Sequence, residues 1–591
     1  MSRFSAPSLM SGGTRFCFGF AKASLLASPM GHMADAAFAA GAGSLGTFSA
    51  WMGVIAFAFQ IYFLFSACVD MAAGVALALG FELGECFDSP LKSEGIADFW
   101  RRWCFVPGGN GAEKVRALRA MVLTLVIGVL WIGPSWGLVV WGVIHSCLLA
   151  LDHRMGAARF YASWPKPLKI AITFFMLLMS WVFFRAETIG AATGYLAIMF
   201  GLGPKLAATA PLLDADMLRN FNAVLLLVCA LVLWVLPSIR TLLRKPARWK
   251  MFLGLCLFAL ALAMMLTRGR GSFLSPVRQH TQSLLTRLGG EGNRAVHIGN
   301  REWLYSRPEI AALHGRGPLM SAIASSAVRQ GRKGTREGVF DLAAHLKERG
   351  VPLMLVPVPV KPMIYPEFLS SQKFDAPVYH RDQLALYEQL RAAGIDVIDL
   401  APEMWRLKLR KQVFLQQDTH WTPDAMKVMA EIIAKHIRTK YPQALRPLEE
   451  TPIVDARILD RSSRGDLVGR LDVASPASLF GQEEVTLVSI VGMDPSADSA
   501  ISVMGDSFVS VFDDPALGFA PGSESGVPRP LKAGFGNQLA VLLNQPLDVM
   551  ARSTGGSLAV MREFATQTEE QLAKKKLVIW VLAADDLISS R

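Results

Sequence analysis

The strongest constraint on this chain is the uneven distribution of its apolar residues, which lie mainly before residue 268. Hydrophobic side chains make up 52% of the 591 residues, and beyond residue 268 charged segments alternate with short apolar ones. A chain of this length holds more than one domain, because single cores stop growing at about 250–300 residues. The sequence therefore predicts a membrane half followed by a soluble half.

The apolar half contains several segments long enough to cross a bilayer, which takes about 20 apolar residues per helix. An additional segment, 17–43, is apolar but rich in Gly, Ala and Ser. A span, a re-entrant piece and an interfacial helix all remain open for it. We expect a multi-pass α-helical membrane half, with spans at 49–80, 119–150, 168–184, 222–238 and 251–267.

Charged residues around the last predicted span indicate its orientation. Five basic residues precede it closely, at positions 240, 244, 245, 248 and 250, and three follow it, at 268, 270 and 278. The positive-inside rule then places the C-terminal half outside the cytoplasm. The first 30 residues lack the charged start, apolar core and cleavage site of a signal peptide, so export would depend on the spans themselves.

Charge and cysteine usage exclude several classes of protein. The net charge is +12, but the basic residues are scattered or flank apolar segments and form no stripe interleaved with aromatic residues. We therefore expect no nucleic-acid partner, and favour a membrane surface or an anionic polysaccharide. All seven cysteines lie at or before Cys256, without a Cys-x-x-Cys pair or a Cys/His cluster. Neither a disulfide framework nor a metal site is expected.

The soluble half shows the alternation of an α/β domain. Apolar runs at 351–358, 396–400, 501–504 and 577–583 predict buried strands, and amphipathic stretches at 336–349, 381–393, 422–440 and 558–574 predict helices. This order favours a mainly parallel sheet with helices on both faces. The polar segment 271–294 is typical of a linker or stalk, and the less regular segment 450–500 is interpreted as an inserted lobe.

Two short motifs suggest nucleophilic catalysis. Ser507 follows Gly505 and Asp506 directly after the apolar run 501–504, where a tight strand-to-helix turn would expose its hydroxyl. His420 lies two residues after Asp418 on a predicted loop. A hydroxyl nucleophile needs a base, and the base needs an orienting carboxylate. We therefore predict Ser507 as nucleophile, His420 as base and Asp418 as its orienting acid.

Each motif alone has a simpler interpretation. A Gly-Asp-Ser turn is often only a turn, and a histidine after Asp-Thr is often a loop residue with a satisfied hydrogen bond. The two motifs occur in one α/β domain, and each lies at the boundary of an element. Their co-occurrence favours the catalytic hypothesis.

The soluble half also resembles a known family. The segments 350–361, 418–423 and 505–508, with Trp-Leu-Tyr at 303–305, are similar to the SGNH-type domains of the alginate O-acetylation proteins. The resemblance spans 295–591 and implies an SGNH-hydrolase-like fold in which the Asp/His pair precedes the serine, the reverse of the order in ordinary SGNH hydrolases. The turn 553–557 is a candidate for the backbone donors to the oxyanion.

The membrane half resembles the membrane-bound O-acyltransferase family over about 12–200. The similarity lies in the segments 59–63, 70–72, 89–93, 98–103, 141–145 and 181–185. That family is longer at its N-terminus, so the resemblance implies a truncated acyltransferase, with two further transmembrane helices and loops at 201–270. It also implies acetyl-CoA as the ultimate acyl donor, with no tightly bound cofactor.

His145 is the candidate catalytic residue of the membrane half, because a histidine inside a membrane segment is costly to bury. The family's Trp-His-Gly is replaced here by Trp-Ile-Gly at 131–133, which leaves His145 as the later histidine of the pattern. The alternative is that His145 only donates a hydrogen bond to a neighbouring helix.

Together these observations predict an O-acetyltransferase that acts on a cell-envelope or exopolysaccharide glycan through an acyl-serine. The expected location is the bacterial inner membrane, with the C-terminal domain in the periplasm. Expected partners are the polysaccharide, the lipid bilayer, and a complete acyltransferase or polysaccharide synthase complex. An SGNH-type glycan acetylesterase and a non-catalytic membrane scaffold remain open, because the choice between water and a sugar as acceptor depends on the shape of the site.

Overall fold

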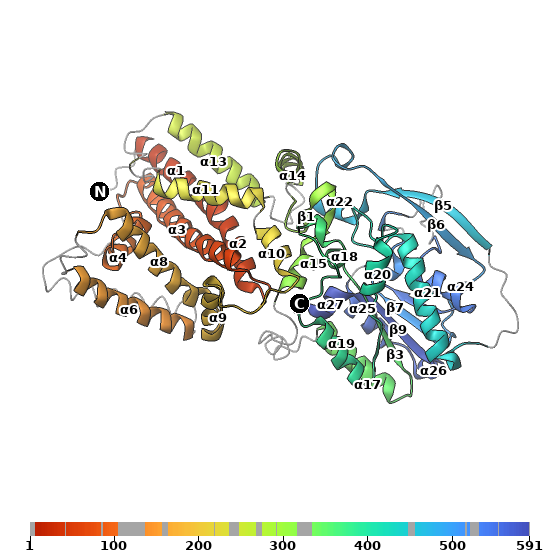
Figure 1. Cartoon of the computed structure of the whole chain (residues 1–591). Helices are drawn as coiled ribbons and strands as arrows, with labels where there is room; N and C mark the ends of the chain where they lie inside the picture. Colours follow the sequence, from red (N-terminus) through yellow and green to blue (C-terminus); the bar gives the residue numbers. More distant parts are fainter. Residues whose placement is uncertain are drawn as a thin grey trace. The chain divides into compact units, whose positions relative to one another are not determined.

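In the computed structural model, the chain divides into two compact units (Figure 1). The first comprises Met1–Leu206 and Asp216–Thr281, and the second comprises Ala207–Ala215 and Gln282–Arg591. The structure describes residues 6–41, 43–83, 87–104, 136–156, 163–217, 219–235, 241, 248–266, 275–290, 292–315, 334–370, 372–446, 455–514, 517–519, 531–553 and 555–589.

All the described secondary structure of the first unit is helical. Small residues let its helices approach closely, since a side chain on Gly12 would lie 2.4 Å from the backbone oxygen of Gly74. Its helices are α1 (Ala6–Ala21), the π-helix η1 (Lys22–Ala27), α2 (Ser28–Ala39), α3 (Thr47–Ala78), the 3-10 helix η2 (Pro90–Lys92), α4 (Ile96–Cys104), α6 (Trp136–Gly156), α8 (Lys166–Arg185), α9 (Ile189–Met199), α11 (Asn220–Trp234) and α13 (Arg248–Leu266).

Two helices in the described part of the chain are long and apolar enough to cross a membrane. They are α3 and α8, which correspond to the predicted spans 49–80 and 168–184. The bent pair of α10 (Ala210–Met217) and α11 would add a third span, near the predicted 222–238. Helix α13 covers most of the predicted span 251–267.

Two further predicted segments are not tested as spans by the structure. The first part of the predicted span 119–150 lies outside the described residues, and its second part falls within α6. The ambiguous segment 17–43 falls on α1, η1 and α2, three consecutive helical pieces. The number of membrane crossings therefore stays a prediction.

The second unit is built on a five-stranded sheet, in which every pair of neighbouring strands is parallel. The strand order is β4-β3-β9-β7-β8. The predicted parallel α/β fold is confirmed, including four of its strands. The strands are β3 (Leu353–Val358), β4 (Asp396–Val397), β7 (Ile501–Gly505), β8 (Asp548–Ala551) and β9 (Leu577–Ala583).

Side chains of the central strand β9 alternate between two apolar cores. Leu577, Ile579 and Val581 pack in one core, and Val578, Trp580 and Leu582 pack in the other. This alternation follows from the two-residue period of a strand, and a strand buried on both faces reads as a continuous apolar run.

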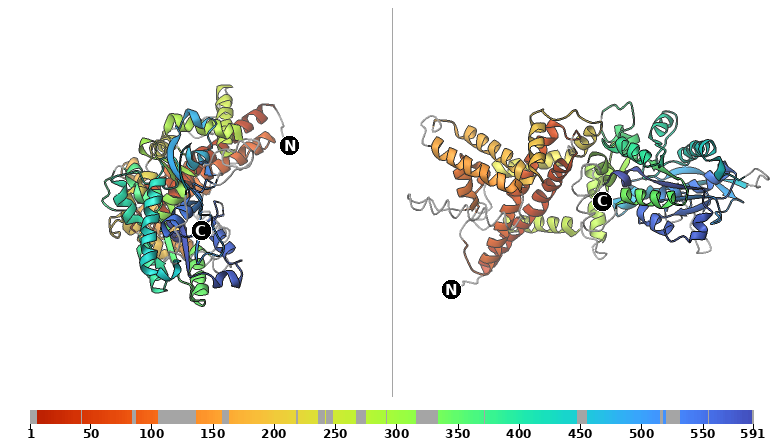
Figure 2. Two further views of the ribbon diagram at one scale, coloured as in Figure 1. Left: turned by 90° about the vertical axis from the view of Figure 1, so that its right-hand side faces the viewer. Right: turned by 90° about the horizontal axis from the view of Figure 1, so that it is seen from below.

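Helices cover both faces of the sheet, as Figures 1 and 2 show. One core is closed by α20 (Ala401–Lys408), α21 (Pro423–Lys440) and α24 (Phe535–Leu543). The other is closed by α17 (Thr335–Lys347), α19 (Gln383–Ala392), α25 (Ser557–Phe564) and α26 (Glu569–Ala573). The single predicted helix 558–574 is thus two helices, because Thr568 and Gln571 form a capping box that starts α26.

The inserted segment predicted at 450–500 contains an antiparallel hairpin of β5 (Asp455–Ser463) and β6 (Glu483–Val491), with α22 (Gly465–Leu471) and η7 (Pro476–Ser478) between them. The predicted linker 271–294 contains a helix, α14 (Ser275–Gly289). The remaining elements are β1 (Val296–Ile298), η4 (Asn300–Glu302), β2 (Leu304–Ser306), α15 (Arg307–His314), α18 (Lys361–Ile364), η5 (Pro366–Phe368), η6 (Pro442–Ala444), α23 (Ser507–Ser510) and α27 (Ala584–Ile588).

Candidate active site

Ser507 lies where strand β7 ends, as the first residue of the short helix α23. The preceding residue, Asp506, caps this helix by accepting a hydrogen bond from the backbone N–H of Phe508 at 2.9 Å. Its other oxygen accepts from Ala583 N at 2.8 Å, at the end of β9. The turn is therefore fastened to two neighbouring strands, and the Ser507 side chain is half-buried at their carboxyl edge.

Only glycine fits at position 505 in this turn. A side chain there would lie 2.3 Å from Val509 Cγ2 and 2.7 Å from the backbone oxygen of Val581. Burial raises the pKa of Asp506 to about 6, although its two backbone hydrogen bonds act in the opposite direction.

Asp418 and His420 form a buried hydrogen-bonded pair. Asp418 Oδ1 accepts from His420 Nδ1 at 2.6 Å and from His420 N at 3.0 Å. Since Nδ1 donates, its proton is fixed there and the lone pair of the neutral ring lies on Nε2. Nε2 has no hydrogen-bond partner in the described part of the chain. This is the tautomer that a general base requires.

The environment of the pair favours its charged form. Burial alone lowers the pKa of His420, but Asp418, Asp466 and Asp506 raise it above its ordinary value. Burial likewise acts to raise the pKa of Asp418, and the opposing effect of His420 and of backbone N–H groups leaves it below its ordinary value. Asp418 is therefore the ionised partner that holds the imidazole.

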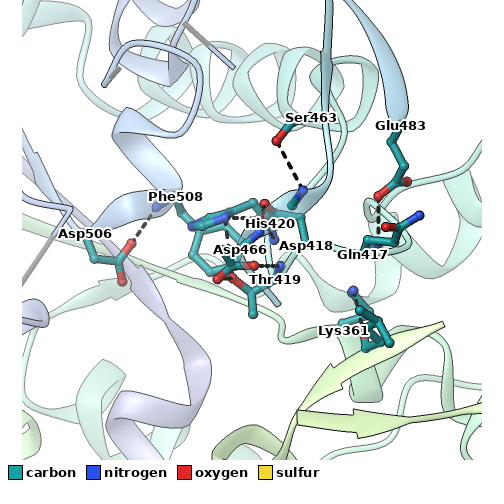
Figure 3. A network of polar contacts seen from close by, with 12 residues as sticks. Lys361, Gln417, Asp418, Thr419, His420, Ser463, Asp466, Glu483, Asp506 and Phe508 are labelled. Carbon is teal, nitrogen blue, oxygen red and sulfur yellow. Dashed lines mark hydrogen bonds and ion pairs between the residues drawn. The ribbon is translucent and has the colours of Figure 1, made fainter. Parts of the chain in front are cut away.

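The loop with His420 and the turn with Ser507 meet through aromatic contacts. The rings of His420 and Phe508 lie 5.0 Å apart, centroid to centroid, and Trp421 packs between Phe508 and Phe535 at 5.4 and 5.8 Å. The Phe508 ring therefore contacts the histidine loop, and the Asp506 carboxylate, bonded to the Phe508 backbone in Figure 3, acts on His420 by its charge. Among the described residues, Ser507 Oγ makes no hydrogen bond to His420 Nε2.

Further residues, which the sequence did not single out, hold the loop in place. Glu483 of β6 accepts from the backbone N–H groups of Gln416 and Gln417 at 2.6 and 2.7 Å. Buried Lys361 donates to Gln416 O at 3.2 Å and to Leu304 O at 2.8 Å. Burial lowers the pKa of Lys361 to about 8. Lys361 lies within the segment 350–361 that carries the family resemblance, whereas Glu483 has no local sequence signal.

Asp418, His420 and Asp466 are also close enough to be considered as metal ligands, with ligand atoms within 4.8 Å of one another. Both carboxylates and Nδ1 are already engaged in hydrogen bonds with one another, with backbone N–H groups or with the Thr419 hydroxyl. The arrangement therefore fits a hydrogen-bonded acid–base cluster.

The candidate oxyanion turn at 553–557 follows β8, next to the end of β7, where Arg552 N donates to Gly505 O at 3.1 Å. Thr554 lies outside the described residues. Ser557 Oγ donates to Asp586 at 2.5 Å, and Ser553 donates to Asp514. The role of this turn as an oxyanion site stays a prediction.

His145 is fully buried in α6, and both of its ring nitrogens have partners. Trp100 Nε1 donates to Nδ1 at 3.2 Å, which leaves Nε2 as the donor to Ser180 Oγ at 3.0 Å. Ser180 in turn donates to the backbone oxygen of Leu177 at 2.8 Å. The ring is thus linked to a carbonyl of helix α8 through one hydroxyl, close to the alternative considered from the sequence.

Comparisons with known proteins give a family match within the second unit and relatives that are named as O-acetylases or O-acetyltransferases. Residues 296–584 match the family described as SGNH hydrolase-like domain, acetyltransferase AlgX. The chain is similar to the probable alginate O-acetylase AlgI of Azotobacter vinelandii, with 36% identity over 207 residues that cover 32% of this chain and 40% of that protein. It is 35% identical over 201 residues to the peptidoglycan O-acetyltransferase of Helicobacter pylori, covering 32% of this chain and 38% of that protein.

A further similarity concerns the probable alginate O-acetylase AlgJ of Pseudomonas putida, which is 33% identical over 153 residues. It covers 26% of this chain and 36% of that protein. The chain therefore spans at most two fifths of the length of these relatives.

Proposed function

We propose that this chain, which carries an SGNH hydrolase-like domain of the AlgX acetyltransferase type in residues 296–584, transfers acetyl groups to a cell-envelope or exported polysaccharide. The observation that carries the proposal is the buried Asp418–His420 pair, whose imidazole contacts the turn that bears Ser507 and whose Nε2 has no hydrogen-bond partner among the described residues. Relatives named as alginate O-acetylases and a peptidoglycan O-acetyltransferase support a glycan as the acceptor.

In the proposed reaction, Ser507 Oγ attacks the carbonyl carbon of the acetyl donor while its proton passes to His420 Nε2. The leaving group takes this proton, and an acetyl-serine ester remains. A sugar hydroxyl then gives its proton to Nε2 and attacks the ester, and Ser507 recovers the proton as the acetyl group departs. The hydrogen bond between Ser507 and Nε2 forms when the donor binds, since such bonds are often long in free enzymes.

Asp418 has two roles in this proposal. Its hydrogen bond to Nδ1 at 2.6 Å keeps the proton on that nitrogen and therefore keeps Nε2 available as the base. Its negative charge stabilises the imidazolium that forms in each half-reaction. Water is a competing acceptor, so the same three residues would make an esterase where the site admits water.

For the first unit, we propose a multi-pass region in the bacterial inner membrane that holds the second unit in the periplasm. Helices α3 and α8 support this proposal by their length and composition. Acetyl-CoA in the cytoplasm is the proposed ultimate donor. The proposed partners are the acceptor polysaccharide and a complete acyltransferase or polysaccharide synthase complex.

We also propose that His145 takes part in passing the acyl group through the first unit. Its ring is held by Trp100 and Ser180, so it would act as a base only after one of these hydrogen bonds opens. The buried position of a polar ring among apolar helices supports a functional role.

A direct test compares acceptors in the purified full-length protein. An activated acetyl ester is supplied with and without oligosaccharides of alginate or peptidoglycan, and acetylated sugar and free acetate are measured. We expect acetylated oligosaccharide, and its loss in Ser507→Ala. Free acetate as the sole product would establish the esterase instead, and equal product from Ser507→Ala would reject the nucleophile.

A further inference from the structure

Asp466 is a second carboxylate beside the Asp418–His420 pair, and it comes from the inserted hairpin lobe. Its Oδ1 accepts from the backbone N–H of Thr419 at 2.8 Å, and its Oδ2 accepts from Thr419 Oγ at 2.9 Å. Its own backbone N–H donates to Asp418 Oδ2 at 2.8 Å. Asp466 therefore holds both Asp418 and Thr419, as Figure 3 shows.

The start of α22 is shaped for this contact. Gly465 has a φ of +74°, and a side chain there would lie 2.3 Å from the backbone oxygen of Gln417. Leu467 N donates to that same oxygen at 3.3 Å. Glycine at 465 therefore lets the backbone of α22 lie directly against the loop, which brings Asp466 N within reach of Asp418.

The charged groups around the imidazole come from several elements. Three carboxylates act directly on His420, and they belong to its own loop, to α22 and to the turn after β7. Farther groups act on these carboxylates, and Arg470 pairs with Asp466 at 2.6 Å. The direct group comprises Asp418, Asp466 and Asp506, and the outer group comprises Lys361, Arg470 and Glu483.

We propose that Asp466 is a positioning residue for the proposed acetyl transfer: it fixes the Asp418–His420 loop and holds a second carboxylate beside the imidazole. This inference rests on the proposed function of that site. Thr419 transmits the positioning through its two hydrogen bonds, and Asp466 reaches Asp418 through its backbone, which no side-chain substitution removes.

The charge and the hydrogen bonds of Asp466 are separable by mutation. Asp466→Asn removes the charge, and the amide oxygen and nitrogen can still bond to Thr419 N and Thr419 Oγ. Loss of a negative charge makes the protonated imidazole less favourable, so the pKa of His420 falls. The carboxylate oxygens of Asp418 and Asp466 and a ring nitrogen of His420 lie within 4.8 Å of one another. At this distance, we expect the pKa of His420 to fall by about one unit.

The experiment follows the rate at which a serine-directed fluorophosphonate labels Ser507 in the full-length protein, from acid to neutral pH. In the wild type, labelling declines toward acid pH as His420 becomes protonated. In Asp466→Asn, we expect the decline at a pH lower by about one unit. In Asp466→Ala, we expect the same displacement with a lower maximal rate, because Thr419 loses both of its hydrogen bonds to Asp466.

Asp460→Asn is the matched control, since it removes a carboxylate of the same lobe on the exposed strand β5, where Asp460 accepts from Thr486 Oγ at 2.8 Å. In this control, the labelling of Ser507 should decline at the same acid pH as in the wild type. Coincidence of the Asp466→Asn and wild-type profiles overturns the inference alone, whereas absence of Ser507 labelling at every pH overturns the proposed function. In that second case, an NMR titration of the His420 ring, assigned with His420→Gln, still decides whether Asp466 raises its pKa.

Discussion

At the residue scale, the central feature is a histidine whose two nitrogens have different environments. Nδ1 is bonded to Asp418, and Nε2 lacks a partner among the described residues. The sequence allowed Asp418, His420 and Ser507 to be predicted, because each follows a strand or precedes a helix in a recognisable motif. It offered no indication of Asp466 or Glu483, since their contacts with the loop exist only once the inserted hairpin has folded against it.

Asp418→Asn tests the orienting role of the carboxylate. The amide can donate to Nδ1, which would place the proton of the neutral ring on Nε2 and block its function as a base. We expect acetyl transfer to fall by about 10⁴-fold, with the fold retained. The measurement is the rate of transfer at saturating donor, with thermal unfolding as the check on folding. A variant that keeps more than about a tenth of the wild-type rate would remove Asp418 from the mechanism.

At the element scale, the site depends on how β7 passes into α23. Gly505 has no room for a side chain, because the backbone of β9 and Val509 of α23 approach it closely. The parallel strands were predictable from their continuous apolar runs, since a strand buried on both faces is apolar throughout. The break between α25 and α26 was not predicted, because the amphipathic pattern continues across the capping box at Thr568.

Gly505→Ala is expected to displace the Ser507 turn. The new methyl group would lie 2.7 Å from the backbone oxygen of Val581, so the backbone must shift. We expect loss of most Ser507 labelling by a serine-directed probe, together with a lower melting temperature. Gly469→Ala is the control, because no atom lies within 4 Å of the added carbon, and alanine is favoured over glycine in a helix by about 1 kcal/mol. Equal labelling in both variants would contradict the proposed role of Gly505 in the turn.

At the scale of the whole molecule, the chain joins an apolar helical unit to a parallel α/β unit. The division was predictable from the change in hydropathy near residue 268. The number of crossings was not, because the apolar segments before it vary in length and segment 17–43 is rich in Gly, Ala and Ser. Residues 207–215 also belong to the second unit, which no feature of their sequence indicates.

Topology is tested with reporters fused after the last residue. Alkaline phosphatase, which folds only outside the cytoplasm, should be active there, and a cytoplasmic reporter at the same position should be inactive. This result is expected because more basic residues precede the last predicted span than follow it. The opposite pattern would place the second unit in the cytoplasm and remove the proposed access to an exported polysaccharide.

The most direct test of the proposed mechanism is to trap the acetyl-enzyme. The full-length protein is mixed with an activated acetyl ester in the absence of sugar, quenched in acid and digested, and the peptide that contains residue 507 is analysed by mass spectrometry. We expect the added mass of one acetyl group on Ser507, its disappearance when an acceptor oligosaccharide is supplied, and its absence in His420→Gln. An unmodified Ser507 under conditions in which the protein still transfers acetyl groups would contradict the mechanism.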